Sequence, residues 1–323
     1  MIINEALSKS WSRVGTRATF GLVMLDLAEK VDRLMVVSAD VSTSAGLDRF
    51  KNAYPEKYLD VGIAEQNMMG IAAGLASEGY SVFTTSFAPF QTMRCCEQIR
   101  VNLGYMGSKV CMVGLASGLV SGILGNTHCC FEDIGVLRSI PGITIITPAD
   151  CAEVAKAVCA AQRHPGPLYV RLTGSTRTPI VYADDYGFEI GKAISLREGA
   201  DVAIIASGMM VHESIVASDL LDKSGISAAV VDMHTVKPLD IETLRGLLSK
   251  KLIVTVEEHS VMGGLGSAVA EFLSRLADRP PLKIIGVPDE FVEVAEYREL
   301  LERYGLTGEA IADAVSDAMR GLY

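Results

Sequence analysis

The stretch DVGIAEQNMMGIAAG, residues 60–74, decides the fold. Its residues are typical of the end of an apolar strand, a tight turn and a helix rich in alanine and glycine that packs closely on a sheet. One acidic residue, Glu65, stands at the junction of strand and helix among apolar neighbours. A carboxyl group there either stabilises the positive end of the helix or serves as a buried acid with a chemical role. This stretch alone leaves both interpretations open.

Around this stretch, apolar runs alternate with helical patterns along the whole chain. Continuous runs rich in valine and isoleucine are typical of parallel sheets that are covered on both faces. A helix is expected over residues 16–31, and the turn-rich stretch 173–187 interrupts the pattern. Strands are expected at residues 34–38, 81–85, 109–117, 143–147, 168–172, 202–206, 229–232, 252–256 and 283–287.

The pattern predicts an α/β fold made of two doubly wound domains with mostly parallel sheets. A length of 323 residues suits two domains better than one. We place the first domain at residues 1–175, a linker at residues 176–190 and the second domain at residues 191–323.

Charge and hydropathy exclude two classes of partner. The net charge of -10, with no cluster of lysine or arginine, argues against nucleic acid. No stretch approaches the roughly 20 apolar residues that cross a bilayer, and the polar N-terminus has no signal-peptide core, so we expect a cytoplasmic location. A mean hydropathy of +0.30 indicates that some apolar surface meets a protein partner.

Five further segments of the chain carry recognisable short motifs. Together with residues 60–74, their order resembles the pyrimidine-binding domain of transketolases followed by the transketolase C-terminal domain, along essentially the whole chain. The segments are TSFAPFQTMR at 85–94, GILGNTH at 122–128, SIPGIT at 139–144, TPAD at 147–150 and VEEHSVMGGLG at 256–266.

The resemblance implies an enzyme that uses thiamine diphosphate to move a two-carbon ketol unit from a ketose or ketose phosphate to an aldose. Enzymes of this class hold the diphosphate through a metal bound at a Gly-Asp-Gly motif, which this sequence does not contain. It therefore implies a split enzyme, in which a separate N-terminal subunit carries the diphosphate and its Mg2+ or Ca2+. No metal ligand is expected in this chain, and an α2β2 assembly follows by analogy.

The resemblance also assigns cofactor contacts residue by residue. Glu65 matches the glutamate that shares a proton with N1′ of the aminopyrimidine ring, a step that activates the cofactor. Phe87 and Phe90 match aromatic residues that stack on this ring, and Val41 lies in a segment that lines it. His128 matches a histidine beside the reacting atoms, so Glu65 and His128 are the expected catalytic residues.

Three residues match positions that bind an anionic sugar, namely Arg17, Ser44 and Arg171, with His128 as a fourth substrate contact. Arginine suits a phosphate because its planar fork donates two charge-assisted hydrogen bonds to one anion. The resemblance therefore implies a sugar phosphate or a related anionic sugar as substrate.

Three positions depart from the family pattern. Leu124 replaces an aspartate that holds a sugar hydroxyl, Ala116 replaces a phosphate-contacting histidine, and Met93 stands where an aromatic residue often completes the pyrimidine pocket. The loss of an acceptor and a cation indicates a changed substrate, and the sequence names neither the donor nor the acceptor.

Three alternatives remain open at this stage. The beta subunit of a 2-oxo acid dehydrogenase is similar in size, but its motif tends toward Thr-Glu-Gln. A 1-deoxyxylulose-5-phosphate synthase usually has histidine where this chain has Asn67. A catalytically silent scaffold subunit would not need to keep Glu65, Phe87, Phe90 and His128 together.

Overall fold

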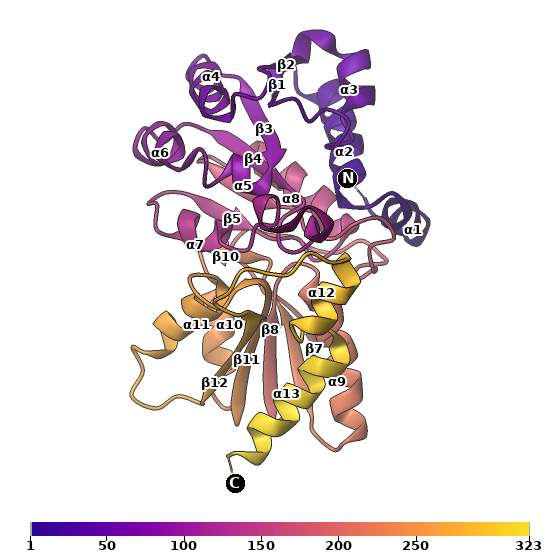
Figure 1. Ribbon diagram of the computed structural model, residues 1–323, viewed down its shortest axis with the longest axis vertical. Helices are drawn as coiled ribbons and strands as arrows, with labels where there is room; N and C mark the ends of the chain where they lie inside the picture. Colours follow the sequence, from indigo (N-terminus) through magenta and orange to yellow (C-terminus); the bar gives the residue numbers. More distant parts are fainter. Residues whose placement is uncertain (1, 323) are drawn as a thin grey trace.

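The computed structural model describes residues 2–322 and contains two sheets, one in the upper and one in the lower half of Figure 1, with helices on both sides. Within this range, the first sheet has seven strands in the order β10-β5-β6-β4-β3-β1-β2. All neighbours are parallel except β10, which is antiparallel to β5. The bounds are β1 Leu34–Ser38, β2 Tyr58–Asp60, β3 Ser81–Phe87, β4 Val110–Leu115, β5 Thr144–Ile146, β6 Leu168–Arg171 and β10 Thr235–Lys237.

The second sheet, over the same described residues, has five strands in the order β12-β11-β8-β9-β7. Only β7 runs antiparallel to its neighbour, β9. This arrangement confirms the α/β class with two mostly parallel sheets. The bounds are β7 Ile194–Arg197, β8 Val202–Ala206, β9 Ala228–Asp232, β11 Leu252–Ser260 and β12 Leu282–Val287.

The helices that precede the second sheet in the sequence lie in the upper half of Figure 1, and the later helices lie in the lower half. Those that precede the second sheet are α1 Glu5–Val14, α2 Thr16–Lys30, α3 Asp48–Ala53, α4 Glu65–Ser77, α5 Ala88–Gln91, α6 Cys96–Gln98, α7 Asp133–Arg138 and α8 Cys151–Arg163. Those in its neighbourhood are α9 Met210–Lys223, α10 Ile241–Gly246, α11 Leu265–Leu273, α12 Tyr297–Arg303 and α13 Gly308–Arg320. No helix in the described part of the chain is long and apolar enough to cross a membrane.

Two hydrophobic cores lie on opposite faces of the sheets. Alternate residues of β8 show the arrangement, because Val202 and Ile204 belong to one core while Ala203 and Ile205 belong to the other. Each core continues from the first sheet into the second. Burial on both faces explains why these strands are apolar without alternation.

The segment expected as a linker is packed rather than loose. Residues 176–190 form no helix or strand, yet Tyr182 is buried and its carbonyl accepts a hydrogen bond of 3.1 Å from the Ser8 hydroxyl. Asp150, at the start of α8, accepts two more from the backbone N–H groups of Val181 and Tyr182, each at 2.8 Å. The segment thus joins α1 and α8 to the second half of the chain.

A buried pair of carboxyl groups lies beside this segment. Asp232 at the end of β9 accepts a hydrogen bond of 2.7 Å from the hydroxyl of Tyr182, and the carboxyl group of Glu153 of α8 lies near enough to interact with it electrostatically. Burial raises the pKa of Asp232 to about 7 and raises the pKa of Glu153 well above its usual range. Because each carboxyl group raises the cost of ionising the other, the two titrate as a pair.

Replacing Asp232 with asparagine is expected to stabilise the protein at pH 8. A carboxyl group with a raised pKa keeps a proton that the unfolded chain releases above about pH 4, so the free energy of unfolding falls as the pH rises from about 4 to about 7. Asparagine can still accept the hydrogen bond from Tyr182 and needs no such proton. Urea unfolding at pH 5 and pH 8 measures the effect, with the exposed Asp313→Asn as control. An unchanged pH dependence in Asp232→Asn would contradict the prediction.

Candidate functional site

The residues predicted for cofactor binding gather at one edge of the first sheet. Strands β1, β3 and β4 are parallel neighbours, so their carboxyl ends meet at this edge. Val41 follows β1, Phe87 ends β3 and Ala116 follows β4. The carboxyl edge of a parallel sheet is the usual place for a ligand in an α/β protein.

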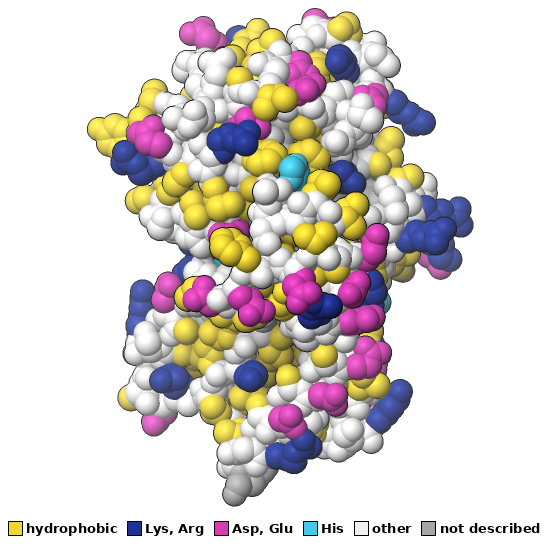
Figure 2. Space-filling view, in the orientation of Figure 1, with side chains coloured by type: hydrophobic (Ala, Val, Ile, Leu, Met, Phe, Trp, Pro, Cys, Tyr) yellow, Lys and Arg dark blue, Asp and Glu magenta, His cyan; other side chains and the backbone are white. Residues whose placement is uncertain are grey.

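Three aromatic rings are in contact at this edge. Phe87 and Phe90 lie edge to face, with ring centroids 6.5 Å apart. The ring of His128 lies 5.4 Å from that of Phe90 and 6.1 Å from that of Phe87. On the face shown in Figure 2, a histidine stands among hydrophobic side chains with basic side chains nearby. The loop that carries His128 therefore returns to the end of β3.

Glu65 is the first residue of α4 and is only 3% exposed. Arg94, from the segment after α5, donates from Nη1 to both carboxylate oxygens of Glu65, at 2.8 and 2.9 Å. The guanidinium of Arg94 also lies over the ring of Phe90, 4.1 Å from its centroid. Arg94 thus connects the buried acid to the aromatic cluster.

Sequence reasoning gave no role to Arg94. The residue stands in the segment that carries both phenylalanines, and it is the basic residue of that segment. Its closeness in sequence to the two phenylalanines was the one feature that could have indicated a role for Arg94 at this site. The ion pair itself joins residues 29 positions apart, so only the fold shows it.

Matches to family models decide the identity of the fold. Residues 12–177 match the model described as "Transketolase, pyrimidine binding domain", and residues 191–311 match "Transketolase, C-terminal domain". The chain belongs to the transketolase family. Membership in this family implies the use of thiamine diphosphate.

Relatives and a solved structure place this transketolase chain among split enzymes. It is 41% identical to the 6-deoxy-6-sulfo-D-fructose transketolase subunit SqwH of Clostridium sp. strain MSTE9, over 93% of each chain. It is 39% identical to an apulose-4-phosphate transketolase subunit of Phocaeicola vulgatus, over 92% of this chain and 95% of that one. A split-gene transketolase solved as an inactive β4 tetramer superposes with a TM-score of 0.85 at 37% identity, over 95% of this chain and 98% of that one. The chain is therefore a subunit of a split transketolase, and the dehydrogenase and scaffold alternatives are not favoured.

The residues at the sheet edge fit the aminopyrimidine ring of the transketolase cofactor. A buried carboxylate supplies a hydrogen-bonding group for a ring nitrogen, and the face of Phe90 beside it supplies a stacking surface. Among residues 2–322, no three histidine, cysteine or acidic side chains come together as metal ligands.

Two residues predicted to bind substrate lie in neighbouring segments. Arg17 is in the first turn of α2, and Ser44 is in the loop after β1. The loop packs against the helix backbone so closely that a Cβ atom on Gly46 would stand 3.0 Å from the carbonyl oxygen of Arg17. Burial lowers the pKa of the Arg17 guanidinium, and no residue of the described chain forms an ion pair with it. Arg17 is therefore available to an anion.

The structure contradicts the substrate role predicted for Arg171. This side chain is 1% exposed, and its Nε donates to both carboxylate oxygens of Asp133, at 2.9 and 3.0 Å. Its Nη2 donates to the backbone carbonyls of Cys130 and Glu258, at 3.1 and 2.9 Å. Arg171 thus joins the first sheet to β11 and is not free to bind a substrate anion.

The three departures from the family pattern occupy different surroundings. Leu124 is 53% exposed on the short helical turn Gly122–Thr127, and Met93 is also exposed, at 38%. Ala116 is buried with φ of 49°, in the left-handed region that histidine enters more readily than alanine. The backbone at Ala116 thus has a conformation that would suit the histidine of the family pattern.

The loop at residues 122–128 is hydrogen-bonded to the C-terminal domain. The side-chain amide of Asn126 donates to the carbonyl of Val292 at 2.7 Å and accepts from the Val292 N–H at 2.9 Å. These reciprocal bonds hold the loop between Leu124 and His128. The position of His128 therefore depends on the segment after β12.

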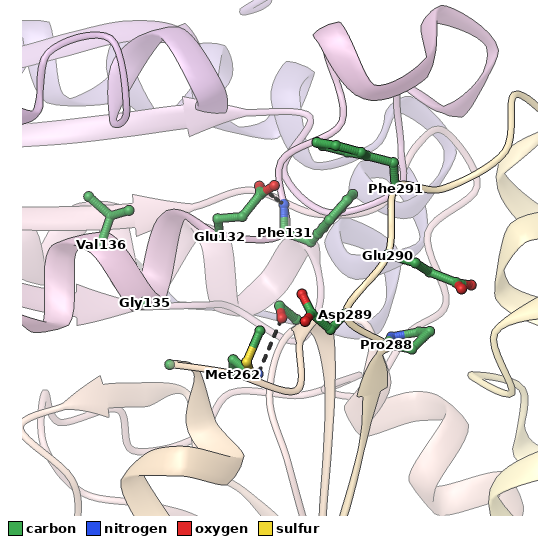
Figure 3. Close-up of a pocket in the computed structure, with 11 residues that line it drawn as sticks. Phe131, Glu132, Gly135, Val136, Met262, Pro288, Asp289, Glu290 and Phe291 are labelled. Atoms are coloured by element: carbon green, nitrogen blue, oxygen red, sulfur yellow. Dashed lines mark hydrogen bonds between the residues drawn. The ribbon is translucent and has the colours of Figure 1, made fainter.

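A groove of about 560 Å³ lies at the junction of the two domains (Figure 3). Phe131, Glu132 and Val136 line it from the first domain, while Met262 and Phe291 line it from the second. None of the residues predicted to bind cofactor or substrate lines this groove. It is thus separate from the candidate site.

Proposed function

We propose that this chain binds the aminopyrimidine end of thiamine diphosphate at the edge formed by β1, β3 and β4. The buried carboxylate of Glu65 beside the ring of Phe90 is the observation that carries the proposal. Phe87 and Val41 complete the surroundings of the ring. A separate subunit holds the diphosphate and its Mg2+ or Ca2+, in a cytoplasmic α2β2 enzyme whose β chain has domains at residues 1–175 and 191–323 around the linker 176–190.

Each residue of the site has a distinct task in this proposal. The bound cofactor supplies the nucleophilic carbon that carries the two-carbon ketol unit between sugars. Glu65 holds a proton at the ring nitrogen N1′, and the phenylalanines exclude water from this carboxyl group. His128 moves a proton at the substrate oxygen, and the Thr127 hydroxyl, 3.0 Å from His128 Nδ1, orients the imidazole.

The substrate is proposed to be a sugar with an anionic end. The substrates in the names of two relatives carry a sulfonate in one case and a phosphate in the other. Arg17, unpaired within residues 2–322, is the residue that we propose for this anion, with Ser44 of the neighbouring loop. Arg171 is left out of the site.

The test of the function is reconstitution with the partner subunit. Co-expression with an N-terminal transketolase subunit that carries Gly-Asp-Gly should give a complex with two copies of each chain. The complex should transfer ketol units only with thiamine diphosphate and a divalent metal. A complex that forms but shows no transfer to any aldehyde would contradict the proposal.

Ribose 5-phosphate and erythrose 4-phosphate are expected to be poor acceptors, with kcat/KM at least ~10-fold below that of the preferred acceptor. Leu124 offers no acceptor for the sugar hydroxyl that an aspartate would bind, and a hydroxyl left unpaired once the partner subunit covers this exposed residue costs ~1–3 kcal/mol. The measurement compares these sugars with branched, sulfonated and uncharged aldehydes. Leu124→Asp is the matched variant and should raise activity toward ribose 5-phosphate. If ribose 5-phosphate is the best acceptor of the unaltered enzyme, the prediction is wrong.

A further inference from the structure

Arg94 makes the two contacts that the cofactor ring needs. Its guanidinium is planar, it hydrogen-bonds both oxygens of Glu65, and it lies over Phe90 with its central carbon 4.1 Å from the ring centroid. In the proposed function, the aminopyrimidine ring hydrogen-bonds Glu65 and stacks on Phe90. The guanidinium of Arg94 and the aminopyrimidine ring cannot both hydrogen-bond Glu65 and stack on Phe90 at the same time.

We propose that Arg94 occupies the aminopyrimidine site whenever the cofactor is absent, in the free subunit and in the assembled complex, and competes with the cofactor ring for Glu65 and Phe90. This inference rests on the proposed function of the site. Arg94 then acts as an internal competitor, which keeps the pocket filled until the ring displaces it.

The surroundings of Arg94 allow its side chain to leave while its backbone stays. The side chain is 43% exposed, so it can swing into solvent without opening the core. The backbone is held at both ends, because its N–H donates to the Pro89 carbonyl at 3.2 Å and its carbonyl accepts from the Gln66 amide at 3.1 Å. The motion therefore involves side-chain rotation alone.

Arg94 also stabilises the buried carboxylate of Glu65 while the cofactor is absent. Glu65 is nearly fully buried, and a buried carboxylate without a partner is costly. Arg94 supplies the opposite charge while the ring is absent, and the N-terminus of α4 adds a smaller favourable term. The ring then takes over the hydrogen bond as Arg94 moves out.

The competition predicts tighter cofactor binding when Arg94 is removed. If the pocket is open in about one molecule in ten, the apparent Kd is about ten times the intrinsic value. In the assembled complex, stripped of cofactor, Arg94→Ala and Arg94→Gln should lower the Kd for thiamine diphosphate, with Mg2+ present, by about 10-fold in calorimetry. The Kd of Arg94→Lys should be intermediate between the Kd of these variants and that of the unaltered protein, because lysine keeps the charge but not the planar group.

Arg100→Ala is the matched control for these titrations. Arg100 lies in the next turns of the same segment and pairs with Glu97 at 3.6 Å, away from Glu65. Its removal should leave the Kd unchanged. An unchanged or higher Kd in both Arg94→Ala and Arg94→Gln would overturn the inference and make Arg94 a permanent partner of Glu65.

The two proposals fail in distinguishable ways. If Glu65→Gln abolishes turnover while the Arg94 variants bind no more tightly, the competition is wrong and the proposed function stands. If Glu65→Gln leaves turnover intact, the proposed function fails, whatever the Arg94 variants do.

Discussion

Replacing Glu65 with glutamine is expected to lower the turnover of the assembled enzyme by more than about 10²-fold. Glutamine keeps the shape of the side chain and can still hydrogen-bond a ring nitrogen, but it cannot hold or release the proton. Folding should be retained, because the change also removes a buried charge. Turnover is measured by ketol transfer in the reconstituted complex at saturating thiamine diphosphate.

The control for this variant lies at the other end of the same helix. Glu78 follows α4 and is exposed, so Glu78→Gln removes one negative charge without touching the aromatic cluster. It should leave turnover unchanged. If Glu65→Gln retained more than half of the activity, Glu65 would not be the acid that activates the cofactor.

Replacing Asp133 with asparagine is expected to lower the free energy of unfolding by about 3–5 kcal/mol. Asp133 is fully buried, pairs with Arg171 and accepts a hydrogen bond of 2.7 Å from the hydroxyl of Tyr169. Asparagine removes the carboxylate that is hydrogen-bonded to the buried guanidinium of Arg171. Urea unfolding at pH 7 measures the loss.

A surface ion pair provides the comparison for Asp133. Arg138 and Glu271 approach to 2.7 Å, but Glu271 is largely exposed, so Glu271→Gln should cost less than ~1 kcal/mol. Asp133→Asn also tests whether Arg171 has a structural role and not a substrate-binding one. A variant with unchanged stability and a loss confined to the KM of the sugar would restore the substrate role of Arg171.

The sequence predicted the sheets well because buried parallel strands have a strong local signal. The runs at residues 34–38 and 202–206 match β1 and β8 residue for residue. Strand β11 extends four residues beyond its expected end because polar Glu257 to Ser260 are buried by the junction. The short strands β7 and β10 were not predicted, since three or four residues carry too little pattern.

The candidate site was harder to predict than the fold. The order of the motifs predicted four site residues, and the structure joins them with Arg94 in one connected cluster. The four are Glu65, Phe87, Phe90 and His128. An ion pair between residues that are distant in sequence leaves no pattern in the local sequence from which it could be predicted. For this reason the ion pairs of Arg94 and Arg171 were absent from the sequence interpretation, and Arg171 was assigned to the wrong task.

Strand β10 makes the first sheet dependent on residues synthesised much later. It comes from the second half of the chain, yet it covers the open side of β5 by pairing with residues 145 and 146. On the ribosome, that side of β5 stays unpaired until residue 237 has emerged. A fragment that ends within residues 176–190 would keep the bare strand edge permanently and would be prone to aggregate. Chimeric transketolases assembled from interchangeable pieces should therefore be joined beyond β10, not at the apparent linker.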